Sequence, residues 1–192
     1  MPYSTPVPVP PTLPNIPPRP SQQAPEDPNG CNEPCEGWPQ GGEFFQVREG
    51  NHNRGARANH TPAWNSIQQS GIALGGIETE SVVNYPNIPS FINQRILEND
   101  GRRISPAICM TVADDAKLSS GGSGRNAVEY RRQQAYWIAN GQFETAQALD
   151  IIDIRNRLGY KYEEGIIQMQ NYTARLKAQS PYLFQLRGYA YT

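Results

Sequence analysis

The sequence lacks long apolar runs, and this absence bears on where the protein can reside. None of its 192 residues falls in an apolar run as long as the roughly 18 residues that a membrane-spanning helix needs. The N-terminus also lacks a basic region followed by an apolar one, the pattern of a secretory signal peptide. We therefore expect a soluble protein without a membrane span, exported, if at all, by a dedicated route that uses no signal peptide.

An excess of charge of either sign is also missing. The chain holds 17 basic and 18 acidic residues, a formal net charge of -1, which excludes the highly basic proteins that coat nucleic acids. Lysine occurs only at positions 117, 161 and 177, so arginine supplies most of the basic side chains. Arginine suits planar, bidentate contacts with phosphate or carboxylate. The composition permits a nucleic-acid substrate without indicating one.

Cysteine and histidine are scarce, which restricts a zinc site. The chain has three cysteines and two histidines, and a structural zinc ion takes four ligands. Cys31 and Cys35 would need both His52 and His60 to complete a site, so a local disulfide or two free thiols is the favoured interpretation. Cys109 lies in an apolar stretch, where we expect a small buried residue of a strand and not a nucleophile.

Proline is concentrated at one end of the chain. Residues 1–40 contain 13 of the 18 prolines and few aliphatic side chains, too few to offset the entropy lost on ordering. We expect a disordered, polyproline-like tail and linker over residues 1–40 and a single globular domain over residues 41–192.

Glycine divides the second half of this domain into helices. Asn126 is expected to cap a helix that runs to Asn140, where Gly141 supplies a left-handed terminator. A second helix is expected from Phe143 to Leu158, before Gly159. A third is expected over 161–179, because apolar side chains recur there at helical spacing until Ser180 and Pro181 end it.

The first half of the domain reads as irregular, with a few short elements. We expect one over 43–47, a helix over 90–99 and a strand over 107–112, whereas the polar stretch 54–65 predicts no element. The predicted fold class is therefore α+β, with an irregular segment and a few short strands followed by an array of about three helices.

Several short segments of the chain form a recognisable pattern. They are His60-Thr-Pro62, Tyr130-Arg-Arg-Gln-Gln134, Gly141-Gln-Phe143, Asp150-Ile-Ile-Asp-Ile-Arg155, Gly159-Tyr-Lys-Tyr162 and Ile166-Ile-Gln-Met169. This pattern resembles one family, the polymorphic-toxin-like modules found at the C-terminal ends of large bacterial secreted proteins. The resemblance covers residues 45–175 and implies a toxin or effector, acting with an inhibitory or delivery protein as partner. The chain departs from the family pattern at one place, where it has Asp114-Asp115 instead of Asp-His.

The first functional hypothesis is a metal-dependent hydrolase acting on nucleic acid. His60 would be the general base, and Asp114, Asp115 and His52 would hold a divalent ion such as Mg²⁺, Mn²⁺ or Zn²⁺ against the scissile phosphate. A second hypothesis is a catalytically silent relative that acts as an interaction or structural protein.

A third hypothesis is an acid/base enzyme of another class. It uses His60 with Asp150 and Asp153, because a spacing of three residues places two carboxylates on one helix face. The competing structural interpretation pairs Asp153 with Arg157 four residues later, and it joins Asp150 to a basic residue of a neighbouring segment, namely Arg131, Arg132 or Lys161.

Overall fold

The computed structural model describes residues 39–49, 56–76 and 101–187. They form a three-stranded antiparallel sheet and several helices, which confirms the predicted α+β class. The proline-rich tail, the helix expected over 90–99 and His52 lie outside the described residues. Within the described part of the chain, no helix combines the length and the apolar character needed to cross a membrane.

The sheet is built around a central strand, β3 (Pro106–Thr111), buried along all but its last residue. β1 (Gly41–Glu43) pairs with one edge of β3, and β2 (Ala56–His60) pairs with the other, both antiparallel. Short helical segments accompany the sheet: α1 (Phe44–Glu49), α2 (Trp64–Ser70), η1 (Ala73–Gly76), α4 (Gly101–Ile104), α5 (Val112–Asp115) and η2 (Pro181–Phe184).

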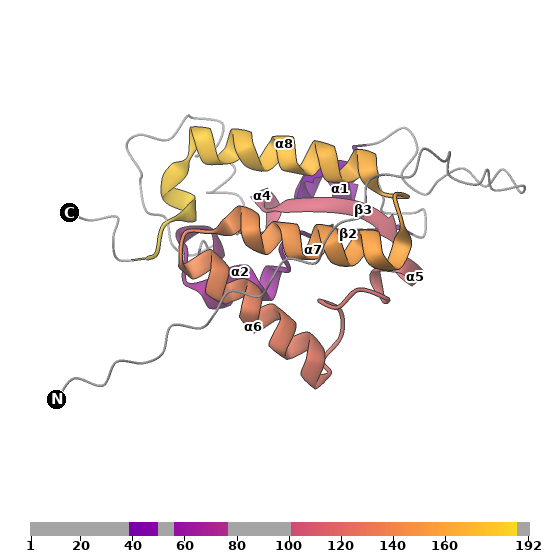
Figure 1. Ribbon diagram of the computed structural model, residues 1–192. Coiled ribbons are helices and arrows are strands. Elements are labelled where there is room, and N and C mark those ends of the chain that lie inside the picture. The colour runs from indigo at the N-terminus through magenta and orange to yellow at the C-terminus, as the bar shows by residue number, and fades with distance from the viewer. Residues whose placement is uncertain (1–38, 50–55, 77–100, 188–192) are drawn as a thin grey trace, which may run out of the picture.

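Three long helices follow: α6 (Arg125–Ala139), α7 (Phe143–Leu158) and α8 (Glu163–Gln179). Figure 1 shows α7 and α8 running along the sheet, while α6 leaves it at an angle. The glycine terminators are confirmed, because Gly141 and Gly159 have φ angles of 75° and 64°. Two boundaries differ from expectation. Gly124 and not Asn126 is the N-cap of α6, and α8 begins at Glu163 instead of residue 161.

The two faces of the sheet meet different partners because successive strand side chains point to opposite sides. Ile108 and Met110 of β3 pack with apolar residues of α7 and α8. Cys109, on the other face, packs with Val47 of α1 and with the alanines of β2. A second apolar cluster joins α2, the start of α7 and η2, and includes Ile67, Phe143 and Leu183.

The prediction that residues 54–65 form no regular element was wrong. β2 and α2 both lie in or begin in this stretch. The segment Ala-Arg-Ala-Asn-His has no β-branched residue, so its propensity gives no signal for a strand. It is a strand because its backbone pairs with β3 from Ala56 opposite Thr111 to His60 opposite Ala107.

Helix α8 approaches the sheet at backbone distance through two glycines. A Cβ atom added at Gly165 would stand 2.7 Å from the carbonyl oxygen of Gln40 and 3.0 Å from the Cγ2 atom of Ile108. A Cβ atom at Gly41 would overlap the backbone of Gly165 itself. Only a residue without a side chain fits at either position, so this contact fixes how deeply α8 lies on β1.

Gly165→Ala tests this contact. Alanine favours a helix over glycine by about 1 kcal/mol, yet we expect the variant to lower the Tm by several degrees, because α8 must move away from β1. Gln170→Ala, at an exposed position of the same helix, is the matched control and should leave the Tm almost unchanged. Thermal unfolding followed by circular dichroism measures both, and a rise in Tm for Gly165→Ala would contradict the contact.

Candidate functional site

His60 lies at the end of β2 in a closed, mainly apolar environment. Its ring stacks on Phe44 with 3.9 Å between the ring centroids, and Trp64 lies 5.8 Å away. Its Nε2 atom lies 3.2 Å from the carbonyl oxygen of Arg102, which can only accept, so Nε2 carries the proton. Burial lowers the pKa of His60 to about 3, although this hydrogen bond favours the charged form. A neutral, enclosed imidazole with this pKa is a weak general base.

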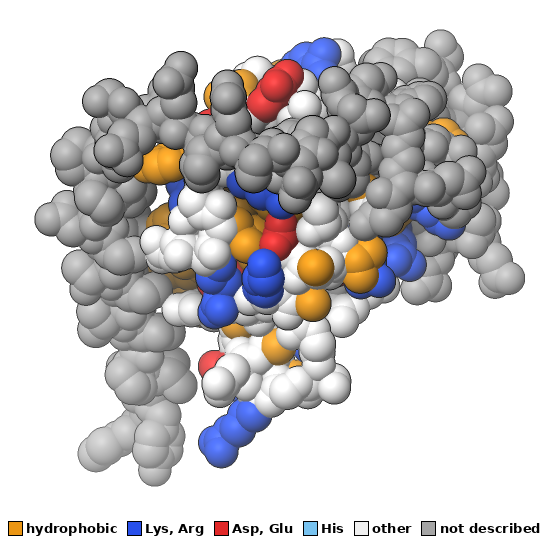
Figure 2. All heavy atoms as spheres, turned by 90° about the vertical axis from the view of Figure 1, so that its right-hand side faces the viewer, with side chains coloured by type: hydrophobic (Ala, Val, Ile, Leu, Met, Phe, Trp, Pro, Cys, Tyr) orange, Lys and Arg blue, Asp and Glu red, His pale blue; other side chains and the backbone are white. Residues whose placement is uncertain are grey.

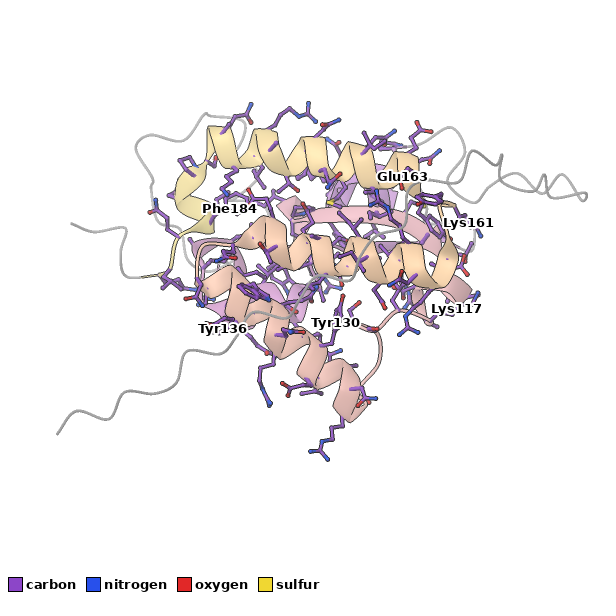
Figure 3. All side chains as sticks on the ribbon, viewed as in Figure 1. Lys117, Tyr130, Tyr136, Lys161, Glu163 and Phe184 are labelled. Carbon is purple, nitrogen blue, oxygen red and sulfur yellow. The ribbon has the colours of Figure 1, made fainter. Side chains whose placement is uncertain are left out.

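Asp114 lies within a set of donors near α5. Its carboxylate accepts hydrogen bonds from the ammonium groups of Lys117 at 2.7 Å and Lys161 at 2.9 Å, and from the Tyr162 hydroxyl at 2.7 Å. Burial raises the pKa of Asp114, but these three donors outweigh it and hold the pKa below its usual range. Figure 3 shows Lys117 and Lys161 at the same end of the molecule. Figure 2 looks onto that end, where basic side chains gather beside an acidic one.

Asp115 points to different partners from those of its neighbour. It forms an ion pair of 2.9 Å with Arg57 and accepts a hydrogen bond from the Asn59 side-chain amide. Asn59 and His60 are consecutive in β2, so their side chains point to opposite faces of the sheet. The structure therefore brings Asp115 to the residue beside His60, but not to the imidazole itself.

The described residues do not assemble the metal site of the first hypothesis. Among them, no three His, Cys, Asp or Glu side chains lie close enough together to hold an ion. An ion at Asp114 would have to displace two ammonium groups, which costs the charge-assisted bonds that they make. His52, the remaining proposed ligand, lies outside the described residues.

Asp150 lies in the interior, between α6 and α7. Its Oδ1 accepts a hydrogen bond of 2.9 Å from the Tyr130 hydroxyl, whereas its buried Oδ2 accepts none from the residues that the structure describes. Burial raises the pKa of Asp150 to about 7, although the nearby Gln134 amide and the Tyr130 hydroxyl favour the charged form. Figure 3 shows Tyr130 between the two helices. The prediction that Asp150 pairs with Arg131, Arg132 or Lys161 was therefore wrong.

The residues that were expected to pair with Asp150 have other partners. Arg131 donates to the carbonyl oxygens of Ser120 and Gly122, Arg132 pairs with Glu129, and Lys161 pairs with Asp114.

Asp153, three residues later in α7, binds a different segment from that bound by Asp150. It accepts hydrogen bonds from the backbone N–H and the hydroxyl of Ser119, at 2.7 and 2.8 Å. It also pairs with Arg157 at 2.7 Å, which confirms the expected pairing four residues along the helix. Asp150 and Asp153 thus bind different segments.

An interior polar network includes residues from two segments of the family resemblance, Thr61 and Gln134. Gln134 of α6 accepts a hydrogen bond from Ser66 of α2 and donates to the carbonyl of Ala146. Gln147 of α7 donates to the carbonyl of Thr61, at 3.0 Å, and to the hydroxyl of Thr173 in α8. These contacts join the segment after β2 to three helices, and two of the quoted segments, 60–62 and 130–134, take part in them.

Cys109 is buried in the strand, as expected, and it is disulfide-bonded. It is therefore not a free thiol, and its partner lies outside the described residues. The alternatives for Cys31 and Cys35 concern residues outside that range as well.

A basic cavity on the α1 side of the sheet was missed by the sequence analysis. It has a volume of about 540 Å³, and Arg48 of α1, Arg57 of β2 and Arg102 of α4 line it. Phe44, Ala56, Ala58 and Val112 form the apolar part of its wall. The bias toward arginine was the one available signal, but the three residues come from separate parts of the sequence and only the fold brings them together.

Among the described residues, only one of these three arginines is neutralised. Arg57 pairs with Asp115, whereas neither Arg48 nor Arg102 forms an ion pair within the described ranges. All three are exposed residues. The guanidinium of Arg102 lies 5.5 Å from the centre of the Phe44 ring, a contact that orients it without cancelling its charge. The cavity therefore offers fixed positive charge to a solute.

The two buried titrating groups predict opposing effects of pH on stability. Asp150 holds its proton in the folded state up to about pH 7 but loses it near pH 4 when unfolded, so its contribution falls as pH rises between these values. His60 stays neutral down to about pH 3 but gains a proton near pH 6.5 when unfolded, so its contribution falls as pH decreases over that range.

We therefore expect a nearly flat free energy of unfolding between about pH 4.5 and 6. Asp150→Asn should make it rise with pH, and His60→Phe should make it fall with pH, each by up to about 1.4 kcal/mol per pH unit. Urea unfolding at each pH measures both slopes, and the double variant should again be flat. If the free energy of unfolding changed with pH in the same direction in both single variants, the predicted opposing effects of the two buried groups would be refuted.

The contacts of Asp114 give a test of the metal hypothesis. We expect Asp114→Asn to lower the Tm by a few degrees, because Lys117, Lys161 and Tyr162 lose their charged acceptor. Calorimetric titration of Mn²⁺ into the wild type and the variant should give no heat that depends on Asp114. Saturable heat in the wild type that disappears in the variant would instead support the metal-dependent hydrolase.

Comparison with known proteins gives no family assignment. No known protein-family model, curated protein or solved structure matches this chain. The resemblance to polymorphic-toxin-like modules, with the effector role and partners that it implies, therefore stays a prediction. The structure shows an α+β fold with a buried polar network and an arginine-lined cavity.

Proposed function

We propose that this domain is a binding module that takes an anionic, phosphate-bearing ligand into the arginine-lined cavity. This proposal develops the second of the three hypotheses, the interaction protein without catalysis. The observation that carries it is that Arg48 of α1 and Arg102 of α4 line one concave surface on the α1 side of the sheet. Guanidinium groups match the geometry of phosphate oxygens and remain charged at every physiological pH.

The size and lining of the cavity favour a small ligand or the end of a larger one. Small-molecule sites commonly measure about 300 to 1,000 Å³ and combine an apolar wall with a few placed polar groups. The 540 Å³ cavity falls in this range. Arg48 and Arg102 come from two short helices and do not form an extended stripe along one helix, the usual footprint of a protein that follows a nucleic-acid backbone.

The contacts of the proposed catalytic residues also favour binding over hydrolysis. His60 is enclosed and hydrogen-bonded to Arg102, and the carboxylates of Asp114 and Asp153 are engaged by donors of the protein. Each of these groups would have to leave its partner before it could act on a substrate. Arg48 and Arg102 form no ion pair among the described residues, so they need no such rearrangement, whereas Arg57 is paired with Asp115.

Substitution of Arg48 and Arg102 tests the proposal. Because one hydrogen bond to a charged group contributes about 1.5 to 3 kcal/mol, we expect Arg48→Gln and Arg102→Gln each to weaken binding about tenfold or more. Calorimetric titration with pyrophosphate and with a single-stranded oligonucleotide provides the measurement, at low salt. Arg125→Gln, at an exposed position of α6, is the matched control.

Two outcomes would contradict the proposal. One is that neither probe binds to the wild type. The other is that binding occurs but weakens equally in Arg48→Gln and Arg125→Gln, which would indicate attraction by the general charge of the surface and not by the cavity.

A further inference from the structure

The disulfide of Cys109 ties the N-terminal part of the chain to the central strand. The sequence contains three cysteines, and Cys109 is disulfide-bonded. Its partner is therefore Cys31 or Cys35. Because a cysteine sulfur forms one disulfide at a time, these two are not joined to each other in the same molecule.

The segment that carries these cysteines is fixed a second time, where it enters the sheet. The backbone N–H of Cys109 donates a hydrogen bond of 2.7 Å to the carbonyl oxygen of Gln40, the residue before β1. Cys35 precedes Gln40 by five residues, and Cys31 precedes it by nine. The chain between the bonded cysteine and Gln40 is therefore a short loop that begins and ends at Cys109.

The side chain of Cys109 determines which face of the sheet this loop contacts. Cys109 lies opposite Ala58 in the register of β2 on β3, and it packs with Val47 of α1 and with Ala56 and Ala58. The same two alanines line the cavity on the α1 side. The two Cα atoms of a disulfide lie about 4.4 to 6.8 Å apart, so the bonded cysteine lies beside the cavity.

The segment that is tied down in this way is acidic. Residues 21–38 contain four acidic side chains and neither lysine nor arginine. Glu33 stands two residues from Cys31 and two from Cys35. Its Cα atom therefore lies within about 7 Å of the bonded cysteine, whichever of the two that is. The four acidic residues are Glu26, Asp27, Glu33 and Glu36.

We infer that the segment 31–36 docks on the α1 side of the sheet, tethered by the disulfide of Cys109, with the Glu33 carboxylate facing Arg48 and Arg102. Both arginines line the cavity and are exposed, so their guanidinium groups are accessible to a carboxylate, and opposite charges favour this position. The inference rests on the proposed function in one respect, because the docked segment competes with an anionic ligand. A competitor on a short tether acts at an effective concentration on the order of millimolar.

Reduction of the disulfide uncovers the cavity. One thiolate of a dithiol reductant attacks one sulfur of the disulfide and displaces the other as a thiolate, and its second thiolate then closes the reductant into a disulfide of its own. Two electrons pass to the protein. Cys109 and its partner become thiols by taking up the two protons that the reductant loses. The loop is then held only at Gln40, so Glu33 competes less well for the arginines.

Peptide mapping without reductant tests the tether in the absence of any ligand. Trypsin leaves Cys31 and Cys35 in one peptide and Cys109 in another, and a protease that cleaves after Glu33 separates the first two. We expect Cys109 to be linked to one of them and the other to be alkylated by N-ethylmaleimide. A bond between Cys31 and Cys35, with an alkylated Cys109, would overturn the tether.

Phenylglyoxal, which modifies guanidinium groups, tests whether the segment covers the cavity. The double variant Cys31→Ser/Cys35→Ser removes the tether and leaves Cys109 and its packing in place. We expect Arg48 and Arg102 to react several-fold faster in this variant than in the oxidised wild type, as measured by mass spectrometry. Arg125, at an exposed position of α6, is the control and should react equally in both. Unchanged rates at Arg48 and Arg102 would overturn the docking.

Calorimetric titration with pyrophosphate links the tether to the proposed function. We expect the double variant, and the wild type in dithiothreitol, to bind about fivefold more tightly than the oxidised wild type, the effect of removing one exposed ion pair. Glu33→Gln should give the same gain with the disulfide intact. Glu26→Gln, outside the loop, is the matched control, and an equal gain from it would overturn the role of Glu33.

The three measurements separate the inference from the proposed function. A mapped tether and protected arginines, with the same pyrophosphate affinity in oxidised and reduced protein, would overturn the competition while the anion-binding function stands. If pyrophosphate binds to none of these proteins, the proposed function fails, and the peptide map and the phenylglyoxal rates still decide whether the segment docks.

Discussion

The arrangement of this domain depends on one close approach, where Gly165 of α8 meets the backbone of β1. Because no side chain separates them, α8 lies low enough on the sheet for Ile166 and Met169 to pack against β3. At the same end of α8, the Tyr162 hydroxyl accepts a hydrogen bond from the backbone N–H of Thr111 and donates to Asp114. If a methyl group held α8 farther from the sheet, each of these contacts would be weaker.

A chain of contacts leads from that packing to the cavity. Tyr162 and Lys161 hold Asp114 in α5, and the next residue, Asp115, holds Arg57 at the cavity wall. Arg57 pairs with Met110 in the sheet, so this ion pair lies on the face that packs against α7 and α8. This explains how a short helix of four residues, α5, can keep a charged side chain in a defined position without a core of its own.

The sequence predicted the elements whose signals are local. Gly141 and Gly159 end α6 and α7, and the apolar spacing of α8 marks its buried face, so the helical half was predictable from neighbouring residues. β2 was not, because an alternation of alanine with polar residues becomes a strand only beside β3.

The candidate site was not predictable either. A sequence motif gives no distances, so it could not show whether His60, Asp114 and Asp115 form one cluster. The fold places His60 and Asp115 on different faces of the sheet. The convergence of Arg48, Arg57 and Arg102 depends in the same way on three segments that only tertiary structure brings together.

The position of the cavity has a consequence for sequence change over time. Most of its lining lies on the α1 side of the sheet, whereas the largest apolar clusters lie with α7, α8 and the segments around α2. Exposed side chains outside a core usually alter stability little when replaced. Selection could therefore exchange the residues that line the cavity, and with them the solute that is recognised, without changing the packing of the helices and the sheet. The interior polar network has no such freedom, since every member of it supports several segments at once.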